Sequence, residues 1–579
     1  MAGGIGLRLA RADAIVLLCL LAVLAGLLTG LFIIVFRLLT ERALVWAAVI
    51  PVADRFEDLG WQWRLGLPTA GGLLIGLLFQ LAPAAARDVG PAHIMAQLAR
   101  QGGRLPLANA LMQFLGGALS IIAGHSVGRE GPVIHLGAAS ASLMGQWMRL
   151  PNNSIRTLVA CGVAASIAAS FNTPLAGVVF AMEVVMYEYT LAGFTPVVLA
   201  AVVAASLSQL VFGPDPALSA GGTQLVSLLE LPWVLLLGLV IGCLAAGYGS
   251  GMGLVRRHGG RYPVWLRITV GGLFTGLCAL VVPEVMGLGY DTVQAAMLGQ
   301  IGFVTLALIV LAKMAATVAC GGLGVPGGLI GPMLVIGAAA GGAMGIVGSW
   351  LMPHAGAGAA FYATLGAVAM MGASLHAPLA ALTAVLELTG NPHIILPGMA
   401  AVVTAFLVAR VCFGQEPLFV SILKARGIDY RIDPVTLALA RTGVAAVMTP
   451  KPAIIDGGTP CGTALRTLAG SPWVVLTSGD RISGIWPARL LASLASKASS
   501  DIALAVAAGR PPSFAVVPVH ATLGEALARL DRADADAALV ISGAVVRAAY
   551  VRGVIVRAQI DRGVRDRSEP RAGPGGPGL

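Results

Sequence analysis

The sequence predicts an all-α polytopic membrane protein followed by a small α/β domain, and three observations support this fold class. Of the 579 residues, 57% are hydrophobic and only 11% are charged, and the mean hydropathy of +0.87 is far above that of soluble globular proteins. A dense cluster of charges at 424–433 ends this apolar texture. Several stretches without a charged side chain are long enough to cross a hydrocarbon core of about 30 Å as helices: 14–36, 194–214, 232–255 and 314–386.

The membrane part should contain short, broken and closely packed helices, because 76 glycines and 33 prolines are too many for uninterrupted spans. The first apolar run follows Arg8 and Arg11, so a cleaved signal peptide is an alternative. The run is too long for a secretory h-region, however, and further spans follow it. We therefore interpret it as the first membrane helix.

Charge and cysteine content restrict the possible functions. The net charge of +10 includes arginines near the N-terminus and after Arg410, so the positive-inside rule predicts that both termini are cytoplasmic. No aromatic residues are interleaved with these charges, and we expect no nucleic-acid partner. The seven cysteines are scattered without a CxxC pair, so they indicate neither a disulfide framework nor a metal site.

The membrane part also contains an internal repeat. The segment GPVIHLGAA (131–139) parallels GPMLVIGAA (331–339), and PLAGVVFAME (174–183) parallels PLAALTAVLE (378–387), at offsets of 200 and 204 residues. The order and the nearly constant offset predict two homologous halves, with convergent packing of small residues as the alternative. Transporters built from repeats place their substrate near the bilayer midplane, where discontinuous helices meet.

Three glycine-rich breaks, at 87–98, 123–137 and 324–337, interrupt the apolar texture. Each break is followed by an apolar run that can restart a helix. The start of a helix has unpaired N–H groups and about half an elementary positive charge, so several helix starts that converge on one point form an anion site. Partial charges suit a permeating anion, because it must leave again.

Two charged residues lie in the second break. Glu130 stands at a helix start built for an anion, where a carboxylate can compete with the substrate until it is protonated or displaced. This pattern predicts a gate; the alternative is a carboxylate that only complements the helix dipole. Arg129 either attracts anions or pairs with a carboxylate structurally, and we favour the structural role.

The segments GREGP (128–132), FNTPLAGVVFAMEVV (171–185) and GVPGGLIGPMLVIG (324–337) resemble the CLC family of chloride channels and chloride/proton exchangers. The resemblance covers about residues 14–426 and places a membrane domain at 1–426. It implies a homodimer in the lipid bilayer, two inverted halves of broken, tilted helices in each subunit, one anion pathway per subunit and no enzymatic activity. It also assigns Glu130 as the external gating glutamate. The residues that it assigns to anion binding are Gly90, Pro91, Gly128, Arg129, Gly131, Leu329, Ile330 and Phe419.

One departure from the family concerns proton coupling. Exchangers have a second glutamate at the inner proton entrance, where this chain has Val184 after Glu183. Valine cannot relay protons, so the sequence favours a gated channel that conducts chloride or other small monovalent anions. The alternative is a chloride or nitrate/proton antiporter in which Glu188 or a water path compensates. A cation transporter is disfavoured, because 314–386 contains no acid.

Two further departures concern the anion site. Pro91 replaces the family's serine, and Phe419 replaces its tyrosine, so neither side-chain hydroxyl is present. Backbone N–H groups would then bind the anion nearly alone. His93 is foreign to the first motif; it is either a pH-sensitive group or, as we favour, a solvent-facing or capping histidine at a helix start.

The C-terminal region from 440 to 562 alternates β and α patterns. Its entry segment VAAVMTPKP (444–452) resembles a pair of CBS domains. Leu490 and Gln559 replace the aspartates that hold a ribose, so a structural or dimer-stabilising role is favoured over adenine nucleotide binding, and we expect no cofactor. The Gly/Pro/Arg-rich segment 563–579 is predicted to be disordered. The expected location is the cell (inner) membrane.

Overall fold

The computed structural model describes residues 15–46, 55–214, 218, 225, 227–351, 357–428, 434–468, 470–543 and 545–568. The chain forms two compact units, which are described separately. The larger unit, which is helical, consists of Cys19–Met144 and Thr157–Tyr430. The smaller unit contains Met1–Leu18, Gly145–Arg156 and Arg431–Leu579. Arg8 and Arg11, on which the predicted topology of the N-terminus depends, lie outside the described residues.

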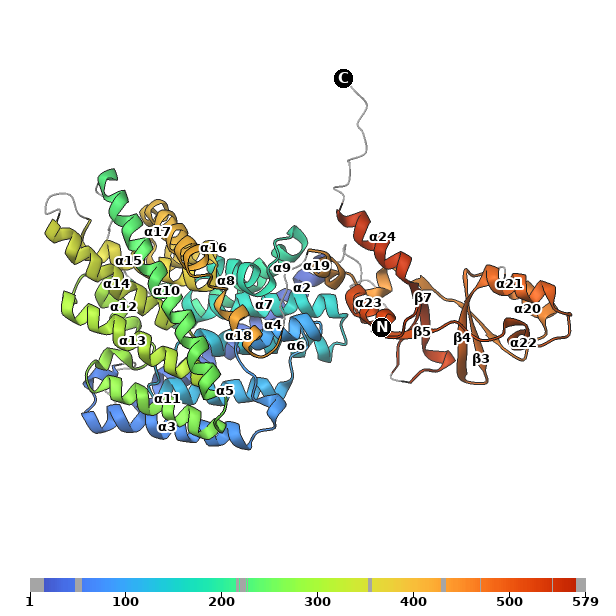
Figure 1. The fold of residues 1–579 in the computed structure, drawn as a ribbon, viewed down its shortest axis with the longest axis horizontal. Coiled ribbons are helices and arrows are strands. Elements are labelled where there is room, and N and C mark those ends of the chain that lie inside the picture. Colours follow the sequence, from blue (N-terminus) through green and yellow to red (C-terminus); the bar gives the residue numbers. More distant parts are fainter. Residues whose placement is uncertain are drawn as a thin grey trace, which may run out of the picture. The chain divides into compact units, whose positions relative to one another are not determined.

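The larger unit is built from many helices of unequal length (Figure 1). Within the described residues, nine helices are long and apolar enough to cross a membrane. Apart from α6, which has 18 residues, the other helices of this unit are shorter, as the glycine and proline content predicts. The helices are α2 (Ile15–Trp46), α3 (Trp61–Leu81), α4 (Pro91–Arg100), α5 (Leu107–Ile122), α6 (Glu130–Trp147), α7 (Asn152–Phe171), α8 (Pro174–Phe180), α9 (Leu191–Phe212), α10 (Leu231–Gly259), α11 (Val264–Ala279), α12 (Tyr290–Met297), α13 (Phe303–Leu323), α14 (Ile330–Leu351), α15 (Gly358–Leu375), α16 (Pro378–Thr389), α17 (Ile395–Leu407) and α18 (Leu418–Ala425).

The internal repeat is confirmed by the way that equivalent helices cross. Helices α6 and α14 begin 200 residues apart, at Glu130 and Ile330. A Cβ atom on Gly137 of α6 would lie 2.4 Å from the carbonyl oxygen of Gly162 in α7. A Cβ atom on the equivalent Gly337 of α14 would lie 2.3 Å from the carbonyl oxygen of Gly366 in α15. Because both crossings use the same positions of their halves, convergent packing of small residues does not explain them.

Two glutamates show that a two-fold axis relates the halves. Glu387, near the end of α16, accepts hydrogen bonds from two N–H groups at the start of α8. Glu183, in the π-helical turn η3 (Ala181–Met186), accepts two from the start of α16. Such an exchange of equivalent contacts is what a two-fold axis produces. The N–H groups belong to Leu175, Ala176, Leu379 and Ala380, with N···O distances of 2.9, 2.7, 3.3 and 2.7 Å.

The C-terminal part of the smaller unit contains the same βαββ arrangement twice. In each copy the first two strands are parallel with a helix between them, and the third strand pairs antiparallel to the second. The first copy consists of β2 (Ala453–Asp456), α20 (Cys461–Leu468), β3 (Trp473–Ser478) and β4 (Arg481–Pro487). The second consists of β5 (Phe514–Pro518), α23 (Leu523–Arg532), β6 (Ala537–Ile541) and β7 (Val551–Val556), and β1 (Thr449–Pro450) extends its sheet beside β7. The remaining helices of this part are α19 (Pro434–Arg441), α21 (Ala488–Lys497), α22 (Leu504–Ala508) and α24 (Arg557–Ser568).

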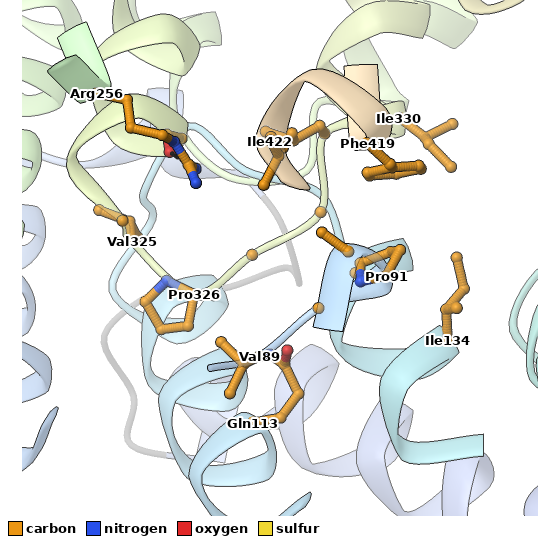
Figure 2. A pocket seen from close by; sticks show the side chains of 18 of the residues that line it. Val89, Pro91, Gln113, Ile134, Arg256, Val325, Pro326, Ile330, Phe419 and Ile422 are labelled. Atoms are coloured by element: carbon orange, nitrogen blue, oxygen red, sulfur yellow. Dashed lines mark hydrogen bonds between the residues drawn. The ribbon is translucent and has the colours of Figure 1, made fainter. Parts of the chain in front are cut away.

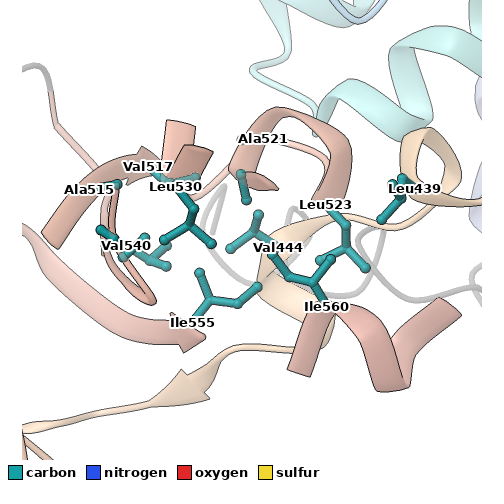
Figure 3. Packing of buried hydrophobic residues seen from close by; sticks show 13 residues of the cluster. Leu439, Val444, Ala515, Val517, Ala521, Leu523, Leu530, Val540, Ile555 and Ile560 are labelled. Atoms are coloured by element: carbon teal, nitrogen blue, oxygen red, sulfur yellow. The ribbon is translucent and has the colours of Figure 1, made fainter. Parts of the chain in front are cut away.

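Each copy has its own core, and the two sheets share a third. Figure 3 shows the core of the second copy, where Val517, Leu530 and Ile555 pack together from two strands and α23. Val475 of the first sheet packs with Leu539 of the second in a shared apolar cluster. These features agree with the predicted small α/β domain and with its resemblance to a CBS pair.

Two observations qualify the prediction for this region. Gln559 replaces the expected ribose-binding aspartate, and its side chain is used inside the protein: it accepts from the N–H of Val556 and donates to Thr449, both at 3.0 Å. Helix α24 continues to Ser568, so residues 563–568 are helical where the composition predicted disorder. Residues 569–579 of the expected tail lie outside the described residues.

Candidate anion site and gate

The second and third glycine-rich breaks meet directly. The N–H of Gly128 donates to the carbonyl oxygen of Gly328 at 2.8 Å, and the N–H of Gly328 donates to that of Gly128 at 2.6 Å. Two residues after this bridge, α6 starts at Glu130 and α14 starts at Ile330. The positive ends of two long helices therefore converge, as the sequence predicts for an anion site.

The Glu130 carboxylate lies over the backbone of this bridge and is only 3% exposed. A Cβ atom on Gly128 would lie 2.0 Å from Glu130 Oε2, and one on Gly328 would lie 2.4 Å from it. Only glycines leave room for the carboxylate at these two positions. Oε1 accepts a hydrogen bond from the Tyr290 hydroxyl, whereas Oε2 has no partner among the residues that the structure describes. A carboxyl group thus occupies the positive end shared by the two helices.

Arg129 is engaged by acceptors of the protein. Its guanidinium lies 2.5 Å from Glu41 of α2 and donates to the carbonyl oxygen of Ser170 at 3.1 Å. It also lies over the ring of Phe171, at 4.7 Å from the centroid. These contacts tie α2, α6 and α7 together, which is the structural role that the sequence analysis favoured.

A cavity of about 80 Å³ lies beside the bridge (Figure 2). The N-terminal ends of α4, α14 and α18 contribute to its wall, so a third and a fourth helix start join the site. Two of the expected anion-binding residues, Gly128 and Arg129, are not part of this wall. The other six line it: Gly90, Pro91, Gly131, Leu329, Ile330 and Phe419.

The two departures from the family lie at the wall of this cavity. Pro91 starts α4 after Gly90, whose φ of +84° favours glycine. Phe419 is 4% exposed, and Figure 2 shows its ring on the same side of the cavity as Ile330. Neither side chain can donate a hydrogen bond to an anion. Proline also lacks a backbone N–H, so the donors left here are the N–H groups of neighbouring residues in the first turns of α4 and α18.

Arg256, which no motif in the sequence indicated as a site residue, also lines the cavity. Figure 2 shows its guanidinium pointing into the cavity. One of its nitrogens donates to the carbonyl oxygen of Gly321 at 3.0 Å, and Nε has no partner among the described residues. The only sequence signal was a basic residue in the last turn of an apolar span. Arg426 lines the cavity as well and pairs with Asp88 at 3.2 Å.

Our preferred interpretation of His93 was wrong. The residue is 4% exposed and does not face solvent. Its Nδ1 lies 3.0 Å from Nε2 of His135, and its Nε2 lies 3.0 Å from the amide nitrogen of Gln97. His135 stands 42 residues away on α6, so no local pattern indicated this pair.

A second, apolar cavity of about 40 Å³ has Glu130 in its wall. Phe171, Phe180 and Leu334 belong to the same wall, and Glu130 is the only titratable group among the described residues that line it. Ala380, whose N–H binds Glu183, also lines this cavity. Val184, which the resemblance places at the family's proton entrance, is buried in η3 directly after Glu183.

Comparisons with known proteins agree with this architecture. The family model described as voltage gated chloride channel matches residues 71–410. A relative from Ralstonia nicotianae, "Putative chloride channel protein ClcB-like", is 34% identical over 65% of this chain and 89% of its own length. The "H(+)/Cl(-) exchange transporter ClcA" of Salmonella paratyphi B is 30% identical over 70% of this chain and 87% of its own length.

Solved structures give the same result. A slow cyanobacterial Cl⁻/H⁺ antiporter matches 71% of this chain and 97% of its own with a TM-score of 0.64 and 25% identity. A eukaryotic CLC transporter, at 19% identity, shares the fold over 94% of this chain with a TM-score of 0.59. This integral membrane protein therefore belongs to the voltage gated chloride channel (CLC) family of anion transporters.

Proposed function

We propose that this protein exchanges chloride for protons, and that Glu130 binds in the place of the anion when ionised and leaves it when protonated. The observation that carries the proposal is the position of the carboxylate over the bridge where α6 and α14 begin. The Salmonella relatives, named as exchange transporters, support coupling to protons. They outweigh the preference for a channel that followed from Val184 alone.

The gate works by competition for the same positive potential. An ionised carboxylate and a chloride ion cannot both occupy the end of the two helices, because like charges at short distance repel. Oε2 of Glu130 is buried without a hydrogen bond among the described residues, which is costly for an ionised group. Protonation, or an arriving anion, therefore displaces the carboxylate easily.

The anion reaches the junction of α6 and α14 through the cavity of about 80 Å³ beside the bridge. Arg256 supplies a full positive charge in its wall. From there the ion meets the starts of α4, α18 and α14, whose partial charges bind it weakly enough to release it. The missing hydroxyls at Pro91 and Phe419 weaken binding further, which favours rapid exchange over tight binding.

A proton needs a separate route to Glu130. Glu183 is the nearest acid in sequence to the lost entrance at Val184, and its carboxylate binds Ala380 at the end of the apolar cavity. We assign Glu183 as the group that takes the place of the missing glutamate, with Glu188 as the alternative. Transient water must bridge the apolar cavity, because Thr173 and Glu130 are the only residues with polar side chains among the described residues of its wall.

The second candidate function is passive chloride conduction with Glu130 as a gate only, and Val184 is the observation that favours it. Purified protein in liposomes with an outward chloride gradient distinguishes the two functions. Exchange predicts proton movement against its own gradient, with chloride flux in a constant ratio to it. Chloride flux that requires a potassium ionophore and moves no protons would reject exchange in favour of conduction.

We propose that two copies assemble in the membrane through the face that holds the reciprocal glutamate caps. Leu175 and Leu379, beside these caps, are 44% and 52% exposed, and Leu396 and Met399 of α17 are also exposed. Cross-linking of a cysteine introduced at Leu379 should yield dimers in native membranes.

We also propose that the protein lies in the inner membrane with both termini in the cytoplasm. The accessibility of tags at the two termini in intact cells tests this topology.

A further inference from the structure

Tyr290 is the first residue of the short helix α12, and the turn before it is held rigidly. Gly287 and Gly289 have φ angles of +62° and +74°, which residues with a side chain rarely adopt. The buried Lys313 donates to the carbonyl oxygens of Val285 and Gly287, at 2.9 and 3.1 Å. The start of α12 is therefore fixed independently of the gate.

The Tyr290 hydroxyl donates to Oε1 of Glu130, across 160 residues of sequence. No other hydrogen bond to this carboxylate is formed within the described part of the chain. A donor to an ionised acceptor stabilises the charged form. The hydroxyl thus stabilises the state in which the carboxylate occupies the place of the anion.

The ring of Tyr290 is packed so that its hydroxyl has little freedom. The ring of Phe171 meets it edge-on, with centroids 5.8 Å apart and an interplanar angle of 67°. The Arg129 guanidinium lies 5.2 Å from the centroid and is itself held by Glu41. A donor that is already positioned loses little conformational entropy when it binds.

We propose that Tyr290 is the positioning residue of the gate: its hydroxyl holds the Glu130 carboxylate in place and sets the pH at which the carboxylate leaves. The family's two anion-binding hydroxyls are absent at Pro91 and Phe419. Once the carboxylate has moved away, the Tyr290 hydroxyl can donate to chloride. The proposal rests on Glu130 acting as the gate.

Two other ionisable groups face Glu130. Arg129 directly precedes Glu130, just before α6 begins, and is paired with Glu41 of α2. Tyr248 of α10 is fully buried and lies near enough to Glu130 to interact with it electrostatically. Its hydroxyl donates no hydrogen bond to Glu130. Both are unchanged by a substitution at Tyr290, so a shift in pH dependence there reports on the hydrogen bond.

Tyr290→Phe removes the hydroxyl and keeps the ring. The loss of a hydrogen bond to a charged group should raise the pH midpoint of acid-activated chloride flux in liposomes by about one to two units. The matched control is Tyr362→Phe, because the Tyr362 hydroxyl donates to another buried carboxylate, Glu230, at 2.8 Å. This control should keep the wild-type midpoint.

Glu130→Gln separates failure of the gate from failure of this inference. If Glu130→Gln keeps the wild-type pH dependence, Glu130 is not the gate. If Glu130→Gln abolishes the pH dependence but Tyr290→Phe keeps the wild-type midpoint, the role of Tyr290 is rejected. It is also rejected if the midpoint of Tyr362→Phe shifts as much as that of Tyr290→Phe. Should Tyr290→Phe fail to fold, Glu130→Asp withdraws the carboxylate from the hydroxyl; the midpoint should again rise, and an unchanged one would reject the role.

Discussion

The two segments that meet at the anion site, GREGP (128–132) and GLIGP (328–332), are equivalent in position but not in chemistry. Both begin with a glycine of the bridge, and both start a long helix at their third residue. That third residue is Glu130 in the first half and Ile330 in the second. The scaffold is therefore symmetric, whereas the carboxylate is present in one half only.

This difference shows which residues specify the fold and which specify function. Glycine and proline recur at equivalent positions because both halves need close backbone approach and a helix start. A single position in the middle of the motif then decides whether the helix end meets a carboxylate or an apolar side chain. Substitutions that alter this asymmetry should have the largest effects.

Ile330→Glu removes the asymmetry and should have the strongest effect. Ile330 lines both cavities, so a second carboxylate would enter the same region as that of Glu130. Like charges would repel chloride, and we expect chloride affinity at neutral pH to fall at least about tenfold, or about 1.4 kcal/mol. Titration calorimetry measures this, with the uncharged Ile330→Gln as control. Unchanged affinity in Ile330→Glu would exclude the junction as the binding site.

The reciprocal caps test whether equivalent positions can differ in function while sharing a structural role. Glu183→Gln and Glu387→Gln each weaken the cap of one helix start, which should cost about 1 kcal/mol and lower the melting temperature similarly. If Glu183 supplies protons, only Glu183→Gln should also reduce proton transport relative to chloride transport. Equal coupling in both variants would contradict the role of Glu183 while leaving the two-fold arrangement intact.

A substitution of Glu57, between α2 and α3, should have the smallest effect, and this effect should be on stability and not on gating. Burial, with a smaller contribution from the neighbouring Asp291, raises the pKa of the Glu57 carboxyl from 4.5 to about 7. The folded protein therefore binds more protons than the unfolded chain between these values, so stability falls as the pH rises from 4.5 to 7. Glu57→Gln should flatten this fall in thermal unfolding experiments. If it shifts the pH dependence of transport instead, the pH sensor is not confined to Glu130.

The elements that carry local signals could be predicted from the sequence. The offset between GPVIHLGAA and GPMLVIGAA indicated the repeat, and the glycine-rich breaks marked the starts of α4, α6 and α14. These features depend on backbone geometry, which glycine and proline determine over a few residues. The position of Glu130 at a helix start follows from the same signals.

Side-chain partners that are distant in sequence could not be predicted. Tyr290 meets Glu130 across 160 residues, and His93 meets His135 on another helix. Arg256 resembled an ordinary basic residue at the end of a span. These contacts depend on how the helices pack, and the apolar periodicity of a broken membrane helix does not specify which side chains face each other. The glycines of GLGYD before α12 were the only hint of Tyr290.

The central claim is that the Glu130 carboxylate occupies the place of the transported anion. Chloride titration of purified Glu130→Gln against the wild-type protein, at a pH where glutamate is ionised, tests this claim most directly. Removal of the competing charge should tighten chloride binding about tenfold or more, or add a bound ion per subunit. Identical affinity and stoichiometry in the two proteins would contradict the claim.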